Sequence, residues 1–586
     1  MTALAVCAHP SRPPPPVDGV AGQARGPGRL NIIFILADDQ GCGDFGFSGN
    51  PRVKTPHIDK LVREGTLFTS FHVSPVCSPT RASLLTGRHH QRTGVFGVVT
   101  GNEYMAADEV TVAELLQAEG YRTALVGKWH LGENYPLVPH AQGFDEFFGF
   151  RDGSSGYFNP VMERNGKEET TKGYLTDILT DEAIAFVERN AHTPFFLYLP
   201  YNAPHSPLEV PESFLAGRDS EPAQTAKLYG MVESMDENIG RLLARVAELG
   251  LDEKTLVIFT SDNGGLPVKS EPQRPNCGLA GWKYDVLEGG VRVPLVMRLP
   301  GHVPAKAEVH VNTAHIDMLP TIADFAGAKL PRALPIDGRS LRPLLQGAES
   351  TAFASRKLFM HYPGETPVDP MAAFPGGSIL SGSTKLVQNK DKLQLFDLAG
   401  DPGEKADLAK GNAVTVAQLE GEFVAWWSAV RGVRPAKPPI PVGYVEENPT
   451  YLRAHPAKLT NLAFQYREDP PLYRSLGVHR DWIARWTTVD GKATWRVDVK
   501  DDTRLRLGLE LRCTSRSNGS KVRIRLGGAS TEAVLSGCTS AGKEWHVEPF
   551  GELEAKQGIS ELTVEAVSLT GESLMELRRV QVERVP

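Results

Sequence analysis

The sequence predicts an α/β fold in which a mixed, mostly parallel sheet is sandwiched by helices, followed by a small antiparallel α+β subdomain and an appended β-sandwich. Three observations support this prediction. Continuous apolar runs alternate with helical segments over residues 30–350, as in a mostly parallel sheet covered on both faces. Residues 351–433 contain strands of alternating polarity and then one helix. Short alternating runs with turn signals fill residues 472–586, which is typical of a β-sandwich.

Length and composition indicate an ordinary globular protein of more than one domain. The 586 residues exceed what a single core holds, and 41% hydrophobic with 23% charged residues is a usual balance. The net charge of −7 offers no basic face for nucleic acid. No apolar stretch reaches the roughly 20 residues of a membrane span. We therefore expect no nucleic acid partner and no transmembrane segment.

Two proline-rich stretches set the remaining boundaries. Residues 1–29 start with a short apolar run without a basic n-region and continue rich in Pro and Gly, so we expect a disordered leader or a poor export signal. Residues 434–471 open with RPAKPPIPVGY, which predicts a Pro-rich linker and connecting segment.

Helical segments separate the apolar runs of the α/β domain. TVAELLQAEG opens with a capping box formed by Thr111 and Glu114. Residues 175–190 and 226–250 carry apolar side chains at helical spacing, and Gly250 is placed to end the second of these helices. This alternation predicts crossover connections between parallel strands.

Four of the apolar runs end in polar residues. They read NIIFILADD, YRTALVGKWH, TPFFLYLPYNAPH and KTLVIFTSDNGG. Ligands of such sheets bind beyond the carboxyl ends of the strands, so the polar residues could share one site. The alternative is ordinary loop polarity, which is less plausible for seven such residues together. The seven are Asp38, Asp39, Lys128, His130, His205, Asp262 and Asn263.

Four of these side chains suit a hard cation. Asp38 and Asp39, with Asp262 and Asn263, supply three carboxylates and one amide oxygen, which favours Ca²⁺ or Mg²⁺ over Zn²⁺. Taken singly, the Asp pair also fits a loop or cap, and SDNGG also fits a turn.

Cys77, in VCSPTRASLLTGR, lies just before an expected helix start. Ser or Thr is predicted to cap that helix, with Pro79 in its first turn. A thiol there would have a lowered pKa and could serve a cysteine hydrolase with His130 or His205 as base. A soft thiolate fits badly beside a hard cation, however. The conflict disappears if Cys77 is converted into an oxygen nucleophile.

The motifs resemble those of one enzyme family. CSPTR followed by ASLLTGR matches the signature of the type I, formylglycine-dependent sulfatases, which are arylsulfatase-like members of the alkaline phosphatase superfamily. The segment from Thr55 to Arg88, VGKWHLG, APHSP, SDNGG, GWKYDVLEGGVRVPLVMRLPG and HIDMLPTIADFAG resemble sulfatase blocks in the family's order. The resemblance implies a sulfuric ester hydrolase with the α/β fold of that superfamily.

The resemblance also implies the nucleophile and its metal. Cys77 would be oxidised to formylglycine by a maturation enzyme, and its hydrate would attack sulfur and touch the metal. The expected ion is Ca²⁺, with Mg²⁺ as the alternative, held by Asp38, Asp39, Asp262 and Asn263 together with residue 77. The second hydroxyl of the hydrate would then expel sulfate and regenerate the aldehyde.

The remaining implied roles concern charge and protons. Arg81 and Lys128 would hold the hydrate and the charge of the substrate, and His130 would assist proton transfers. His205 and Lys283 would contact the sulfate, with His205 protonating the leaving oxygen. The alternatives are an ordinary surface lysine at position 283 and satisfied structural histidines at positions 130 and 205.

The natural substrate is open at this level. Sulfated small molecules and sulfated glycans both fit, and a glycan would favour a periplasmic or secreted location over the cytoplasm. The leaving-group residue is expected within RDGSSGYFNP, where Asp152, Ser154 and Ser155 are the candidates. A phosphonate or phosphate diester hydrolase of the same superfamily and an inactive glycan-binding protein are the competing functions.

The C-terminal module leaves two further questions. The sandwich could bind carbohydrate or pack against the catalytic domain, because fold does not establish function. Cys513 and Cys538 lie in one strand-rich region and could form a disulfide bond, which sequence alone does not decide. Trp426 and Trp427, in the helix AVTVAQLEGEFVAWWSAV, are expected in the core of the α+β subdomain.

Overall fold

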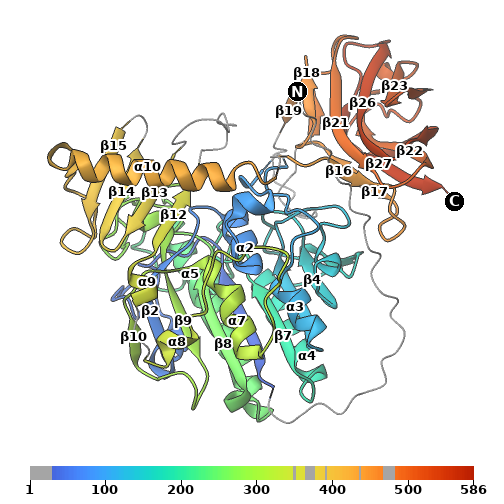
Figure 1. Cartoon of the computed structure of the whole chain (residues 1–586). Coiled ribbons are helices and arrows are strands. Elements are labelled where there is room, and N and C mark those ends of the chain that lie inside the picture. Colours follow the sequence, from blue (N-terminus) through green and yellow to red (C-terminus); the bar gives the residue numbers. More distant parts are fainter. Residues whose placement is uncertain are drawn as a thin grey trace.

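The computed structural model describes most of the chain and places it in three compact parts (Figure 1). The predicted leader, residues 1–29, lies outside the described residues except for Arg29. The described ranges are 29–99, 101–347, 351–362, 376–389, 392–434, 437–465 and 482–585.

An eleven-stranded mixed sheet forms the centre of the first part. Its middle strands are parallel, and antiparallel pairs lie toward the flanks, as predicted. Its order is β10 (Ala307–Val309), β2 (Thr66–His72), β9 (Arg292–Arg298), β8 (Thr255–Ser261), β1 (Asn31–Ala37), β7 (Phe195–Pro200), β3 (Arg122–Lys128), β4 (Glu146–Phe150), β5 (Val161–Arg164) and β6 (Lys167–Thr170), with β11 (Thr313–Ala314) beside β2.

Both faces of this sheet are buried because helices cover each of them. Strand β1 shows the alternation: Ile32 and Phe34 pack in one apolar cluster, and Ile33 and Ile35 pack in the cluster on the opposite face. One face carries α1 (Pro56–Glu64), α4 (Leu175–Arg189) and α5 (Ala223–Glu248), and the other carries α2 (Cys77–Thr86), α3 (Val112–Ala118) and α7 (Met318–Ala326). Short helices α6 (Glu288–Val291), α8 (Arg342–Leu345) and α9 (Thr351–Ala354) complete the connections.

The structure confirms the predicted capping box and the predicted helix-ending glycine. Thr111 accepts from the backbone of Glu114, whose side chain accepts in return from Thr111, so the capping box is present. Gly250 follows the end of α5 with φ +68°, a left-handed conformation that glycine adopts without steric cost.

The α+β subdomain is a four-stranded antiparallel sheet covered by one helix (Figure 1). Trp427 is buried, and Trp426 stacks on Phe359 with ring centroids 4.7 Å apart, so both tryptophans pack in this subdomain as expected. Its elements are β12 (Lys357–His361), β13 (Gly377–Ser381), β14 (Thr384–Asn389), β15 (Lys392–Asp397) and α10 (Ala413–Val430).

Two six-stranded sheets form the C-terminal sandwich. One contains β16 (Ile440–Val442), β21 (Lys492–Val499), β26 (Gly558–Ser568), β23 (Lys521–Leu526) and β24 (Ala529–Val534), with β18 (Lys458–Thr460) beside β21. The other contains β19 (Ala463–Gln465), β20 (Trp482–Ala484), β27 (Glu576–Val585), β22 (Thr503–Arg512) and β25 (His546–Ala555), with β17 (Thr450–Arg453) beside β27.

The sandwich begins earlier than the predicted residue 472. Strands β16 to β19 lie within the segment 434–471 that was expected to be a linker, and each pairs with another strand of the sandwich. These strands have only three or four residues each, which is too short for a clear alternation. Pro441 lies in β16, an edge strand, where proline is tolerated.

Cysteines are mostly paired. Cys513 bonds to Cys538, the pair considered from sequence, and Cys42 bonds to Cys277 across 235 residues, a pair that the sequence did not suggest. Cys77 is the free cysteine of the described chain. Across the described ranges, no helix combines the length and the apolar character that crossing a membrane requires.

Candidate active site

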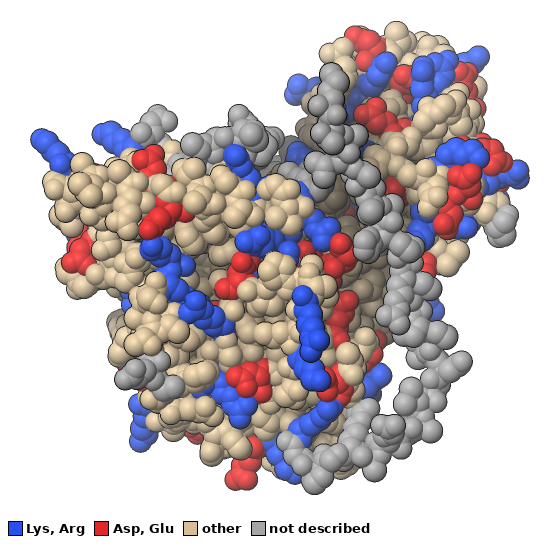
Figure 2. All heavy atoms as spheres, in the orientation of Figure 1, with Lys and Arg blue, Asp and Glu red and all other residues tan. Residues whose placement is uncertain are grey.

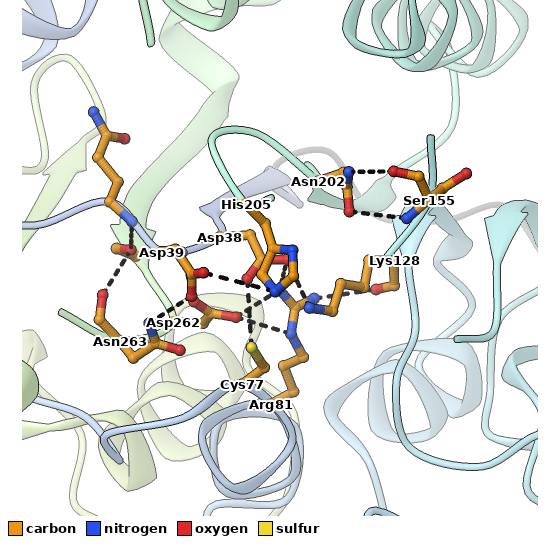
Figure 3. A network of polar contacts seen from close by, with 12 residues as sticks. Asp38, Asp39, Cys77, Arg81, Lys128, Ser155, Asn202, His205, Asp262 and Asn263 are labelled. Atoms are coloured by element: carbon orange, nitrogen blue, oxygen red, sulfur yellow. Dashed lines mark hydrogen bonds and ion pairs between the residues drawn. The ribbon is translucent and has the colours of Figure 1, made fainter. Parts of the chain in front are cut away.

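The carboxyl ends of the central strands bring most of the predicted polar residues together (Figure 3). Asp38 and Asp39 follow β1, and the register of β1 with β8 sets Ala37 beside Ser261, so Asp262 follows at the same edge. The backbone N–H of Asp262 donates to the carbonyl of Ala37 at 3.0 Å. The parallel topology thus converts two distant dipeptides into one cluster.

Helix α2 delivers Cys77 to this cluster. The helix begins at Cys77, and its N-cap is Val76 without a side-chain cap, so the expected Ser or Thr cap was wrong. Thr80 instead accepts from the backbone N–H of Ser74 at 2.9 Å and fixes the preceding turn. The Sγ of Cys77 lies 3.4 Å from Oδ1 of Asp38.

The Cys77 thiol is a poor nucleophile as it stands. Burial raises its pKa well above the ordinary value, and the neighbouring carboxylates of Asp262 and Asp38 raise it further. The lowered pKa expected from a helix N-terminus was therefore wrong, because burial and, after it, the neighbouring acids outweigh the effect of the helix. This result disfavours the cysteine hydrolase with His130 or His205 as base.

Three cations compensate the three carboxylates. Lys128 Nζ lies 2.6 Å from Oδ2 of Asp38, and Lys283 Nζ lies 2.8 Å from Oδ1 of Asp39. Arg81 Nη2 lies 2.7 Å from Oδ2 of Asp262 and 3.6 Å from Oδ2 of Asp38. All of these side chains are at most 4% exposed, so Lys283 is not a surface lysine. Such buried charges persist only when they are paired.

The carboxylates differ in their ease of ionisation. Burial raises the pKa of Asp39, but the charge of Lys283, the nearby His205 ring and the hydrogen bonds from Asn263 and Lys283 outweigh burial and lower that pKa to about 2. Burial and repulsion by Asp38 raise the pKa of Asp262 to about 6. A divalent cation between these groups would relieve the repulsion.

The oxygen atoms of the cluster fit a hard cation. Asn263 Nδ2 donates to Asp39 at 2.8 Å and to the carbonyl of Gly264, whereas its buried Oδ1 has no hydrogen-bond partner among the described residues. An unpaired buried carbonyl oxygen is costly unless something binds it. Donor atoms of Asp38, Asp39, Cys77 and His205 also lie within 4.8 Å of one another, so His205 borders the group that could hold a metal.

His205 enters the cluster from the loop after β7. Its Nδ1 lies 2.6 Å from the carbonyl of Ser206, so Nδ1 carries the proton and Nε2 faces Asp39 at 3.6 Å. Burial and then the charge of Lys283 lower the pKa of His205 to about 3. The ring is therefore neutral at pH 7 with Nε2 as an acceptor.

His130 follows the end of β3 and contacts the loop that contains Val98. It has φ +60°, and its Nε2 lies 3.0 Å from the carbonyl of Val98. A Cβ added at Gly153 would lie 2.7 Å from that Nε2, so the ring packs directly on the segment after β4. The Nε2 atom of His130 thus contacts the backbone at Val98, and the ring lies between Val98 and Gly153.

The three candidates in the segment after β4 have different surroundings. Asp152 pairs with Arg453 of the sandwich at 2.8 Å. Ser155 exchanges backbone hydrogen bonds with the side chain of Asn202, and the hydroxyl of Ser154 is buried without a partner in the described structure. Sequence reasoning missed Asn202, although it lies in the quoted run YNAPH, and missed Arg453, for which no local pattern exists.

Known proteins share this architecture. The family model described as Sulfatase matches residues 30–328, and the model described as N-sulphoglucosamine sulphohydrolase, C-terminal, matches residues 281–423. N-acetylgalactosamine-6-sulfatase of Sus scrofa is 34% identical over 448 residues, which covers 67% of this chain and 83% of that protein. Arylsulfatase A of Homo sapiens is 34% identical over 437 residues, which covers 65% of this chain and 84% of that protein.

Solved structures agree with the sequence relatives. The structure of Ps i-CgsB in complex with k-i-k-neocarrahexaose superposes with a TM-score of 0.63 at 30% identity, covering 70% of this chain and 94% of that chain. The fold, the strand-edge cluster and these relatives lead to one conclusion. The chain belongs to the sulfatase family of the alkaline phosphatase superfamily and is an enzyme that hydrolyses sulfate esters.

Proposed function

We propose that this sulfatase hydrolyses the sulfate monoesters of a sulfated carbohydrate, using hydrated formylglycine made from Cys77 and a bound Ca²⁺ ion. The observation that carries the proposal is the position of Cys77, which lies at the start of α2 and 3.4 Å from Asp38 within a charge-balanced cluster. A raised thiol pKa and a set of oxygen ligands both favour an oxygen nucleophile at this position.

Conversion of Cys77 supplies the chemistry that the thiol lacks. One hydroxyl of the hydrated aldehyde attacks sulfur, the bond from sulfur to the ester oxygen breaks, and the second hydroxyl then loses its proton and expels sulfate. The balance is one ester and one water giving one alcohol and one hydrogen sulfate. Because Cys77 is 2% exposed, we expect the maturation enzyme to act before the domain has folded.

The positive side chains neutralise the sulfate as it is attacked. Lys128 and Arg81 flank residue 77 from β3 and α2, and we assign them to the hydrate and to the sulfate oxygens. Lys283, which contacts Asp39 at 2.8 Å, is assigned to the sulfate as well. Such pre-positioned charges stabilise the transition state more than the ground state, since they face the charge that develops.

His205 is assigned to the leaving oxygen. Its ring borders the cluster with Nε2 inward and Nδ1 fixed by Ser206. A proton taken up at Nε2 can be passed to the departing alcohol. His130 is assigned to assist the proton transfers of the hydrate, since it follows Lys128 at the carboxyl end of β3.

Asp38, Asp39, Asp262 and Asn263 would hold the metal together with residue 77. When bound, a divalent cation would add positive charge against the sulfate oxygens and relieve the repulsion between the acids. Ca²⁺ is preferred because all four side chains offer oxygen, and Mg²⁺ is the alternative.

Sulfated carbohydrate is the preferred substrate class for two reasons. One relative is named for N-acetylgalactosamine 6-sulfate, and one structural neighbour was solved with k-i-k-neocarrahexaose. The two disulfide bonds favour an oxidising compartment, so we infer a periplasmic or secreted enzyme.

The test starts with mass spectrometry of residue 77, followed by turnover of a panel of sulfated sugars and of 4-nitrophenyl sulfate. Matched phosphate diesters form the second arm. We expect formylglycine at residue 77 and a preference for sulfate. Full activity in protein whose Cys77 is entirely thiol would overturn the nucleophile, and a preference for phosphate diesters would overturn the substrate class.

Removal of the metal gives an independent test. Dialysis against a chelator should abolish turnover and lower the thermal unfolding midpoint, and Ca²⁺ at about 100 times its Kd should restore about 3 kcal/mol of stability. Asn263→Ala should weaken the restoration. An unfolding midpoint that does not respond to chelator or to either cation would contradict the assigned metal site.

A further inference from the structure

The sandwich contacts the loops that surround the active site. Asn134, which follows β3, donates from Nδ2 to the carbonyl of Tyr451 at 3.0 Å. Arg151, which follows β4, pairs with Glu447. Strand β17 and the residues beside it therefore lie against two loops that begin at the carboxyl edge of the central sheet.

This junction has an apolar core of its own. Tyr104 and Leu137 of the catalytic domain belong to the same buried cluster as Leu452 and Trp495 of the sandwich. Tyr104 and Leu137, the two residues from the catalytic domain, are at most 6% exposed. The sandwich is thus packed onto the catalytic domain, unlike a module held only by a flexible linker.

Arg453 is the charged centre of the junction. Its Nη1 lies 2.8 Å from Oδ2 of Asp152, and its Nε lies 3.1 Å from Oε2 of Glu133. The two carboxylates are 1% and 5% exposed, so each needs a positive partner. The carbonyl of Arg453 accepts from the indole Nε1 of Trp495 at 2.6 Å, which ties this residue to the sandwich core.

The segment that Arg453 holds leads directly to the active site. Gly153 packs on the ring of His130, where an added Cβ would lie 2.7 Å from Nε2. Ser155 donates its N–H to Oδ1 of Asn202 at 3.4 Å and accepts from Nδ2 at 3.1 Å (Figure 3). The carbonyl of Asn202 accepts from the backbone N–H of His205 at 2.9 Å.

We propose that the sandwich is an integral part of the substrate site, in which Arg453 acts as a positioning residue that fixes residues 152–155 as the wall beside the leaving sugar. The proposal rests on the proposed function, because His205 marks the leaving-group side only if it protonates the departing oxygen. It also gives the sandwich a role other than that of a separate carbohydrate-binding module.

The physical reason is the burial of Asp152 and Glu133. Without Arg453, Asp152 would lose its 2.8 Å ion pair and Glu133 would be left beside His455 at 3.7 Å, so the segment would move to bring the buried carboxylate of Asp152 toward water. The hydroxyls of a sugar leaving group need hydrogen-bond partners at fixed positions in residues 152–155. A small aryl leaving group has no such hydroxyls and should depend much less on the position of this segment. Displacement of a positioning element by about 1 Å can cost up to about 100-fold in kcat/KM.

The experiment compares kcat and KM for 4-nitrophenyl sulfate with those for the sulfated sugar that the wild type hydrolyses best. Arg453→Ala should lower kcat/KM for the sugar by about tenfold or more, mainly through KM, and change the aryl sulfate by less than about threefold. Arg453→Lys keeps one positive charge and should recover part of the loss.

Two further variants separate positioning from general stability. Asp152→Asn in the Arg453→Ala background removes the carboxylate charge that has lost its ion pair with Arg453, so the double variant should be no worse than Arg453→Ala alone. Arg506→Ala is the matched control, since Arg506 pairs with Glu552 and Glu583 on the outer face of the sandwich. It should leave the ratio of the two kcat/KM values unchanged.

Several results would overturn the proposal. An unchanged ratio in Arg453→Ala would do so, as would losses in the two single variants that simply add in the double variant. If Arg453→Ala does not fold, Arg453→Lys and Asp152→Asn carry the same ratio test. A wild type that hydrolyses no sulfate ester would overturn the proposed function and this proposal together, whereas an active wild type with an unchanged ratio would overturn this proposal alone.

Discussion

The active-site cluster of the catalytic domain and the outer face of the sandwich differ in how far their charged side chains are buried. Asp38, Lys128 and Arg81 have no exposed side-chain surface, and each is held by a partner within the cluster. The sandwich carries ladders in which Arg504 and Arg506 are 56% and 49% exposed and face glutamates on the next strand. Figure 2 shows basic and acidic side chains interspersed on the sandwich surface. Burial makes each charge of the first region depend on its partner, and solvent removes that dependence in the second.

The largest effect is expected for activity at Cys77. Cys77→Ser retains one hydroxyl and lacks the second, so it can accept sulfate but cannot expel it. We expect at most one equivalent of alcohol per enzyme and steady turnover lower by at least about 10³-fold. A burst experiment with 4-nitrophenyl sulfate measures both quantities, and Ser83→Ala on the same helix is the control. Sustained turnover by Cys77→Ser would remove the argument for two hydroxyls.

The next effect is on stability, at a buried ion cluster outside the active site. Lys385 Nζ lies 2.8 Å from Glu288 and 3.0 Å from Glu404, and all three side chains have no exposed surface. Lys385→Ala removes the cation that the two buried carboxylates share and leaves Glu288 with His72 at 3.2 Å and Arg292 at 3.7 Å, so it should cost about 3–5 kcal/mol. Chemical denaturation measures the loss.

The same sheet offers a matched control for that variant. Lys357 pairs with Glu422 at 2.6 Å, but the two side chains are 32% and 29% exposed. Lys357→Ala should cost less than about 1 kcal/mol. Equal losses in Lys357→Ala and Lys385→Ala would mean that burial does not set the dependence on a partner.

Most of the fold could be predicted because its signals are local. The apolar runs of the central strands are continuous, since both faces are covered, and the capping box and Gly250 mark helix ends within a few residues. Strands β16 to β19 were not predicted because each has only three or four residues, too few for a visible alternation, and β16 also contains Pro441. Their pairing depends on sandwich strands much later in the chain.

In the active site, too, contacts that depend on the packing of distant segments could not be predicted from the sequence. Parallel strands place Asp38 and Asp262 at one edge whatever their separation in sequence, so topology alone could bring them together. Arg453 meets Asp152 across 301 residues, and Cys42 meets Cys277 across 235, through the packing of loops and domains. No spacing rule reports such contacts. Residues that position the site were therefore harder to predict than residues that form it.

A smaller effect concerns a buried histidine near α2. Burial lowers the pKa of His90 to about 3, although its Nδ1 lies 2.7 Å from the carbonyl of Val95. The unfolded chain takes up a proton below about pH 6.5, and the folded protein does not, so this contribution is present above pH 6.5 and is lost as the pH falls toward 3. The loss should be about 2 kcal/mol between pH 6.5 and 5.

His90→Gln removes that titration and tests the sign. Unfolding measured from pH 7.5 to pH 5 should show the wild type losing stability more steeply than the variant. If the stability of the two proteins fell in parallel with pH, His90 would take up its proton as readily in the folded as in the unfolded state. Burial would then not control its charge.

The smallest effect is expected on the outer face of the sandwich. Arg506 Nη2 lies 3.0 Å from Glu552 and its Nη1 lies 3.2 Å from Glu583, but Arg506 is about half exposed and both glutamates are reached by water. Arg506→Ala should change stability by less than about 1 kcal/mol, and salt should shrink the difference further because it screens exposed pairs. Thermal unfolding at low and high salt measures this. A loss as large as that of Lys385→Ala would show that the ladders act as a cooperative network, and the contrast between the two regions would then lie in the number of partners and not in burial.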